Sequence, residues 1–176
     1  MKKDVSNLMR LLSLTIVLAL ITPAITNAQA GKANFAGTWA LNAEKSTQPQ
    51  GGGGGGGQRM GGGDFVATQA ANLLTSTRTR TGQDGTPTTT ILKYTLDGKE
   101  SINTNPRGDS KSVATWSADG KNLTIATSRT MDMNGETREI KSTEAWTLTD
   151  AKTLSITSTR QGQNGEVKTT MVYDKK

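Results

Sequence analysis

Short turn signals recur along the chain after residue 64, and they separate stretches rich in threonine and other strand-forming residues. Asn-Gly and Asp-Gly pairs favour the tight loops of β-hairpins. Such pairs stand at Asp84-Gly85, Asp97-Gly98, Asp119-Gly120, Asn134-Gly135 and Asn164-Gly165. Because short turns place each strand beside the one before it, the pattern predicts an antiparallel up-and-down meander.

The stretches between these turns alternate apolar and polar residues, as strands with one buried face do. We expect no helix after residue 30, and about nine strands: Phe35–Asn42, Phe65–Gln69, Leu73–Thr81, Thr88–Leu96, Lys111–Trp116, Leu123–Met133, Glu136–Leu148, Leu154–Gln161 and Glu166–Tyr173. A single open sheet of this size would leave exposed edges, and closure removes them. The expected fold class is therefore all-β, a meander closing into a small barrel of about 8–10 strands.

The first 30 residues have the pattern of a secretory signal peptide. Basic residues precede an apolar run from 11 to 21, and Ala28-Gln29-Ala30 matches a small-residue cleavage site. The run is too short for a good membrane anchor. We therefore expect residues 1–30 to be removed and the rest to be exported, to the periplasm or the extracellular space.

The rest of the chain is long enough for one domain. Residues 31–46 carry the first strand, 47–64 form a glycine-rich flexible loop, and 65–176 form the remainder of the barrel. No regular element is expected within the loop, because glycine loses the most backbone entropy when it is ordered.

Composition excludes several chemistries. The chain contains no Cys and no His, so disulfides, thiol nucleophiles and Ser-His-Asp triads are impossible, and the commonest zinc ligands are absent. The charges are dispersed singly, and after residue 30 they sum to only +4, which argues against a nucleic-acid interface. The strands carry Thr where a membrane barrel would carry lipid-facing residues. We expect no metal, no cofactor, no nucleic-acid partner, no integral membrane insertion and no enzymatic activity.

The first expected strand carries a family resemblance. Phe35-Ala36-Gly37-Thr38-Trp39-Ala40-Leu41, followed by a meander of strands, resembles the lipocalin and fatty-acid-binding-protein group of small barrels, and also exported bacterial lipocalin-like domains. The resemblance covers residues 35–173 and implies that Trp39 packs across the closed end of the barrel. It also implies an interior Arg and Tyr that hold an anionic ligand. The chain departs from the fatty-acid-binding pattern between its first two strands, where the glycine-rich loop replaces a helical lid.

Three arginines are candidates for ligand binding. The segment Leu123–Arg129 is repeated at Leu154–Arg160, and more loosely at Leu74–Arg80. In each copy the arginine follows the leucine by six residues, so both lie on the same, apolar face of the strand. Arg80, Arg129 and Arg160 could therefore grip a carboxylate or phosphate, with the hydroxyls of Tyr94 and Tyr173 beside them. The alternative is that the three guanidinium groups extend into water near the hairpin tips.

Four further residues share the apolar faces. We expect Trp39, Trp116 and Trp146 to be structural core residues rather than sugar-stacking platforms. Glu144 has the same parity as Trp146, so we expect it to point inward, with Arg129 or Arg160 as its partner.

The preferred hypothesis is a non-catalytic exported barrel that binds a small hydrophobic or anionic amphiphilic ligand. The alternative is an envelope or extracellular structural or protein-interaction module whose barrel interior is filled by its own side chains. Small inward residues such as Ala114, Thr127 and Ser142 favour the first hypothesis, since they leave room inside.

Overall fold

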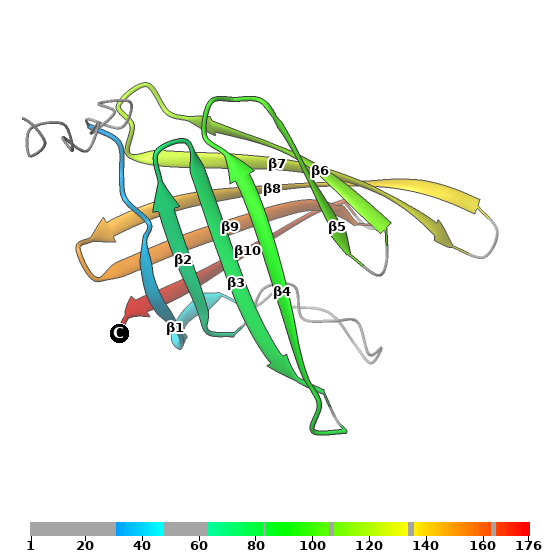
Figure 1. Ribbon diagram of the computed structural model, residues 1–176, viewed down its shortest axis with the longest axis horizontal. Coiled ribbons are helices and arrows are strands. Elements are labelled where there is room, and N and C mark those ends of the chain that lie inside the picture. Colours follow the sequence, from blue (N-terminus) through cyan, green and yellow to red (C-terminus); the bar gives the residue numbers. More distant parts are fainter. Residues whose placement is uncertain (1–30, 48–62, 83, 106–107, 134–135, 163–164) are drawn as a thin grey trace, which may run out of the picture.

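The computed structural model describes residues 31–47, 63–82, 84–105, 108–133, 136–162 and 165–176 (Figure 1). These residues form ten strands and no helix: β1 (Gly37–Thr47), β2 (Phe65–Ala70), β3 (Leu73–Thr81), β4 (Pro87–Thr95), β5 (Glu100–Asn105), β6 (Gly108–Trp116), β7 (Asn122–Met133), β8 (Glu136–Asp150), β9 (Thr153–Gly162) and β10 (Gly165–Lys175). The expected signal peptide (1–30) and most of the glycine-rich loop lie outside the described residues.

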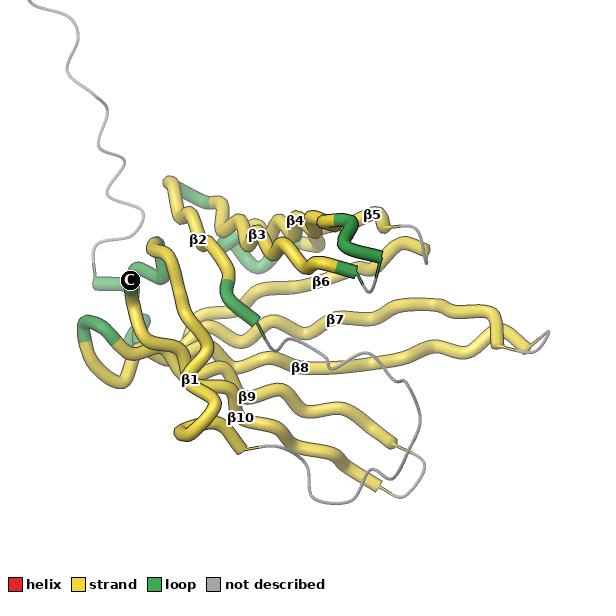
Figure 2. Tube along the Cα trace, turned by 90° about the horizontal axis from the view of Figure 1, so that it is seen from below, coloured by secondary structure: helices red, strands yellow, loops and turns green. Residues whose placement is uncertain are grey.

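All ten strands belong to one antiparallel sheet in the order β4-β3-β2-β1-β10-β9-β8-β7-β6-β5. Every strand therefore lies beside its sequence neighbour except at one place, and the pairing of β1 with β10 brings the two ends of the meander together. The sheet curls so that β2 to β5 lie opposite β8 to β10 (Figure 2). The predicted fold class, an all-β up-and-down meander forming a nearly closed barrel, is confirmed.

The strand missing from the sequence prediction is β5. Its one large apolar residue, Ile102, points outward and is 61% exposed, whereas Ser101 and Asn103 are buried. The strand therefore lacks the apolar alternation by which the others were recognised. β1 also continues five residues beyond the predicted Asn42, across an irregularity where the Ser46 hydroxyl accepts a hydrogen bond from the Val172 N–H at 2.9 Å.

One end of the barrel is filled by aromatic rings, and we call it the closed end. Phe35 stacks on Trp116 with ring centroids 5.8 Å apart and meets Trp146 edge-on at 5.7 Å. Trp39 is fully buried and its indole N–H donates to the Phe35 carbonyl oxygen at 2.9 Å. Burial of rings this large supplies much of the hydrophobic stabilisation of a small core.

The inward side chains of β6 to β10 form rows across the strands, and their size falls away from the closed end. The row nearest the aromatic core is Trp116, Leu123, Trp146, Ile156 and Met171. The next, which we call the middle row, is Ala114, Ile125, Glu144, Ser158 and Thr169, and the one after it, the outer row, is Ser112, Thr127, Ser142, Arg160 and Val167. Beyond the aromatic core the inner wall therefore carries mainly small and polar side chains.

β4 and β5 are the two edge strands of the sheet, and we call the line along which they meet the seam. The described residues show no backbone ladder there. Instead the Asn103 side chain accepts from the Lys93 N–H at 2.7 Å and donates to the Lys93 carbonyl oxygen at 3.0 Å. The Ser101 hydroxyl accepts from the Thr95 N–H at 2.8 Å. Side chains of β5 thus satisfy backbone groups of β4 that a neighbouring strand would otherwise pair.

Candidate functional site

The candidate site lies inside the barrel, where the aromatic core ends and the small inner side chains begin. Arg78 of β3 places its guanidinium carbon 4.3 Å from the centroid of the Phe65 ring. The same guanidinium donates to the Tyr173 hydroxyl at 3.5 Å and to the Gly63 carbonyl oxygen at 3.3 Å. Phe65 and Tyr173 meet edge-on at 4.9 Å. A cation is therefore held against two aromatic rings, a favourable arrangement in a partly desolvated site.

An acidic side chain belongs to the same cluster. Glu144, in the middle row on β8, accepts a hydrogen bond from the Trp146 indole N–H at 2.9 Å. The Trp146 ring in turn meets Phe65 at 5.6 Å. Glu144 is half-buried, as its parity predicted, but the hydrogen bond that holds it comes from Trp146 rather than from Arg129 or Arg160.

The pKa of Tyr94, on β4, depends on the burial and the charges of this interior. Its ring is 6% exposed, and burial raises the pKa of its phenol above the ordinary value. The negative charge of Glu144 raises this pKa further, and the positive charge of Arg78 lowers it. Both charges therefore act on Tyr94, which remains a neutral hydrogen-bonding group at neutral pH.

The structure separates the five predicted ligand-binding residues into two groups. Tyr94 and Tyr173 are buried near Arg78. Arg160 lies in the outer row and is exposed. Arg129 lies one row further out, beside Ser110 and Ile140. Its guanidinium donates to the Met131 sulfur at 2.9 Å.

Arg80 is exposed on β3, paired with Thr88 near the β3–β4 hairpin tip. The two tyrosines are thus in the core cluster, and the three arginines are nearer the hairpin tips.

The arginine of the core cluster, Arg78, was missed by the sequence argument. The six-residue spacing of the repeat points to Arg80, which aligns with Arg129 and Arg160. Arg78 follows Leu74 by four residues and has the same parity. The parity of Arg78 could therefore have identified it from the sequence. Its greater distance from the hairpin tip distinguishes it from Arg80.

The three tryptophans pack in or against the core cluster, although to different degrees. Trp39 is 0% and Trp146 is 1% exposed. Trp116 is half-buried, with the Lys32 ammonium 5.4 Å from its ring centroid. Among the described residues its indole N–H is a buried polar group without a hydrogen-bond partner.

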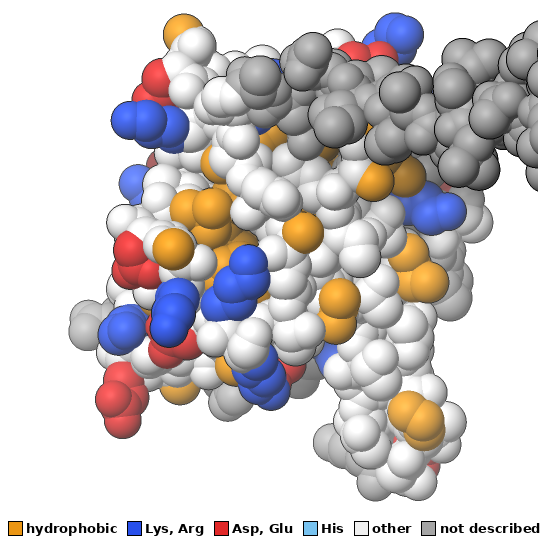
Figure 3. Space-filling model, turned by 60° about the vertical axis from the view of Figure 1, so that its left-hand side comes forward, with side chains coloured by type: hydrophobic (Ala, Val, Ile, Leu, Met, Phe, Trp, Pro, Cys, Tyr) orange, Lys and Arg blue, Asp and Glu red, His pale blue; other side chains and the backbone are white. Residues whose placement is uncertain are grey.

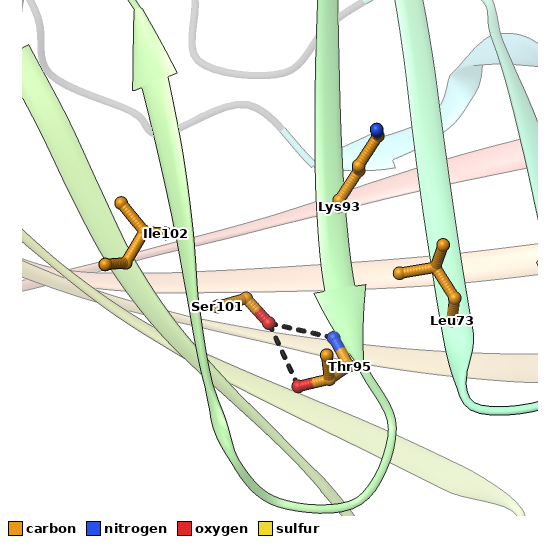
Figure 4. Close-up of a pocket in the computed structure, with 5 residues that line it drawn as sticks. All are labelled: Leu73, Lys93, Thr95, Ser101 and Ile102. Atoms are coloured by element: carbon orange, nitrogen blue, oxygen red, sulfur yellow. Dashed lines mark hydrogen bonds between the residues drawn. The ribbon is translucent and has the colours of Figure 1, made fainter.

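A second feature lies on the outside of the barrel, over the seam. A hollow of about 250 Å³ is lined by Leu73, Lys93, Thr95, Ser101 and Ile102, and Ser101 reaches across it to Thr95 (Figure 4). The large hydrophobic side chains most exposed among the described residues, Val66, Leu73, Ile91 and Ile102, all belong to β2 to β5. In a space-filling view, hydrophobic side chains form separate patches among other uncharged side chains and backbone (Figure 3). The hollow is smaller than typical small-molecule sites.

The residues that the structure describes lack two kinds of feature. No group of three or more acidic, His or Cys side chains lies close enough to hold a metal ion within this part of the chain. Within the same residues, no helix is long and apolar enough to cross a membrane.

No protein-family model matches the chain. No curated protein sequence matches it either. Its structure is similar to the crystal structure of a zebrafish ileal bile acid-binding protein complexed with cholic acid, with a TM-score of 0.55. The two sequences are 17% identical, and the match covers 82% of this chain and 100% of the other. The chain therefore has the lipocalin-like fold of the small fatty-acid- and bile-acid-binding barrels, as the Gly37-Thr38-Trp39 resemblance implied.

Proposed function

We propose that the protein is an exported, non-catalytic barrel that binds a small amphiphile with an anionic group inside its β-sheet. The observation that carries this proposal is the position of Arg78, an always-charged group set among Phe65, Tyr94 and Tyr173 at the inner limit of the aromatic core. A guanidinium there can receive a carboxylate, sulfate or phosphate. The hydrocarbon part of the ligand would extend along the middle and outer rows.

Four further observations support the proposal. The middle and outer rows contain small side chains, including Ala114, Ser112 and Ser158, which occupy less of the interior than large apolar residues would. The fold is similar to that of a barrel complexed with cholic acid, an anionic amphiphile. The leader-like pattern of residues 1–30 supports export. Arg80, Arg129 and Arg160 lie nearer the hairpin tips, where they would attract an anion before it reaches Arg78.

The test is ligand binding by the full chain expressed with its own leader and purified from the fraction in which it accumulates. Native mass spectrometry should show a co-purifying mass of lipid-like size. Isothermal titration with dodecanoate should then give saturable one-to-one binding, which Arg78→Gln should weaken by at least about tenfold, or 1.4 kcal/mol.

The matched control is Arg138→Gln, which removes an exposed arginine paired with Glu136 at 2.8 Å on the outer part of β8. It should leave dodecanoate binding unchanged. A clean apo mass together with no heat of dodecanoate binding would refute the proposal and favour the alternative, a filled barrel that meets a protein partner.

A further inference from the structure

The interior site carries both signs of charge on one connected set of side chains. The Glu144 carboxylate is bonded to the Trp146 indole at 2.9 Å, the Trp146 ring meets Phe65 at 5.6 Å, and the Arg78 guanidinium lies 4.3 Å over Phe65. Both charged groups also act on the phenol of Tyr94. Arg78 and Glu144 therefore face the same interior region from nearly opposite parts of the barrel, β3 and β8.

A carboxylate in this position opposes the binding of a simple anion. Glu144 is half-buried, and its two neighbours in the middle row are Ile125 and Ser158, neither of which is charged. An anionic head group at Arg78 would approach Glu144 in a medium where charges are weakly screened. A head group that also carries a cation would instead satisfy both side chains.

We propose that the ligand of the interior site is a zwitterionic amphiphile, whose anionic group binds Arg78 and whose adjacent ammonium group binds Glu144. The inference rests on the proposed function and narrows its ligand class. The Trp146 N–H holds one Glu144 oxygen, Oε2, so the other oxygen is the acceptor for the ammonium. The Tyr94 and Tyr173 hydroxyls supply neutral hydrogen bonds to the anionic group.

The test uses two ligands that differ at one position. Dodecanoate carries only a carboxylate, and 2-aminododecanoate carries the same chain with an ammonium on the neighbouring carbon. Titration calorimetry of the full chain, below the aggregation concentrations of both, should show 2-aminododecanoate binding at least about tenfold more tightly. Glu144→Gln should abolish or reverse this preference, because it removes the charge but keeps an oxygen that accepts from Trp146.

The matched control is Glu139→Gln, on the same strand but exposed and paired with Lys141 at 3.1 Å, which should leave the preference unchanged. If wild-type protein binds dodecanoate as tightly as 2-aminododecanoate, the zwitterion inference is wrong while the proposed function stands. If neither ligand binds, the proposed function itself fails. Because the wild-type preference alone decides the question, a Glu144→Gln variant that does not fold leaves the inference testable.

Discussion

Replacing Asn103 by leucine should weaken the barrel at the seam between β4 and β5, where the described residues show no backbone ladder. The Asn103 side chain is 6% exposed and makes two hydrogen bonds to Lys93, at 2.7 and 3.0 Å. Leucine has the same branched shape but neither donor nor acceptor, so the Lys93 N–H and carbonyl would lose their partners. An unsatisfied buried polar group costs about 1–3 kcal/mol. Water entry and the extra apolar burial of leucine offset part of this cost, so we expect the free energy of unfolding to fall by about 2–3 kcal/mol.

The measurement is urea unfolding followed by tryptophan fluorescence, with the loss taken from the shift in midpoint at a constant slope. Hydrogen exchange should show the Lys93 amide exchanging faster than the amides of β9 and β10, which keep their ladder. The control is Thr157→Val, which deletes a side-chain hydrogen bond of 3.0 Å to Thr170 between strands that also share backbone bonds. It should cost about 1 kcal/mol or less.

An Asn103→Leu variant no less stable than Thr157→Val would contradict this prediction. That result would mean that the two Lys93 backbone groups exchange the Asn103 amide for water without cost, and that the seam contributes little to closure.

Three further predictions concern the aromatic core, the buried phenol of Tyr94 and the leader. Trp39→Ala, which empties a fully buried site, should lower the free energy of unfolding by about 3–5 kcal/mol, measured in urea. The raised pKa of Tyr94 means that the folded protein keeps the phenolic proton longer than the unfolded chain, so stability should fall as pH rises above about 10. Tyr94→Phe should reduce that fall in urea titrations carried out at several pH values. N-terminal sequencing of the exported protein should begin near Gly31, and an uncut chain starting at Met1 would contradict the leader assignment.

The parts of the fold that sequence predicted well are those set by local chemistry. β3 matches its predicted bounds, Leu73–Thr81, because leucines and a two-residue turn mark its start and a glycine its end. β5 was missed because its buried positions are polar, and they became buried only through contact with β4, a tertiary event that leaves no periodic signal. In the sequence, polar residues whose side chains take the place of backbone hydrogen bonds between strands resemble loop residues.

The candidate site shows the same division between local and tertiary information. Parity placed Tyr94, Tyr173 and Glu144 on inner faces, and it cannot tell how deep along a strand a residue lies. Arg78 and Arg80 have the same parity, and only the register of the sheet puts Arg78 beside Phe65 and Arg80 beside Thr88 near a hairpin tip. Depth depends on how strands from distant parts of the chain align, which no single strand encodes.

The large buried rings lie at one end of the barrel, and mainly small and polar side chains line the inner wall beyond them. Large rings at the closed end, with Trp39 and Trp146 almost fully buried, concentrate apolar burial where the two ends of the meander meet through β1 and β10. The wall beyond them buries less apolar surface, so it contributes less hydrophobic stabilisation. Arg78 and Glu144 lie at the boundary between the two zones, where each contacts an aromatic ring, and this is where we propose that the head group of a ligand binds. Charges placed deeper would carry the full desolvation penalty, and charges placed further out would be screened by water.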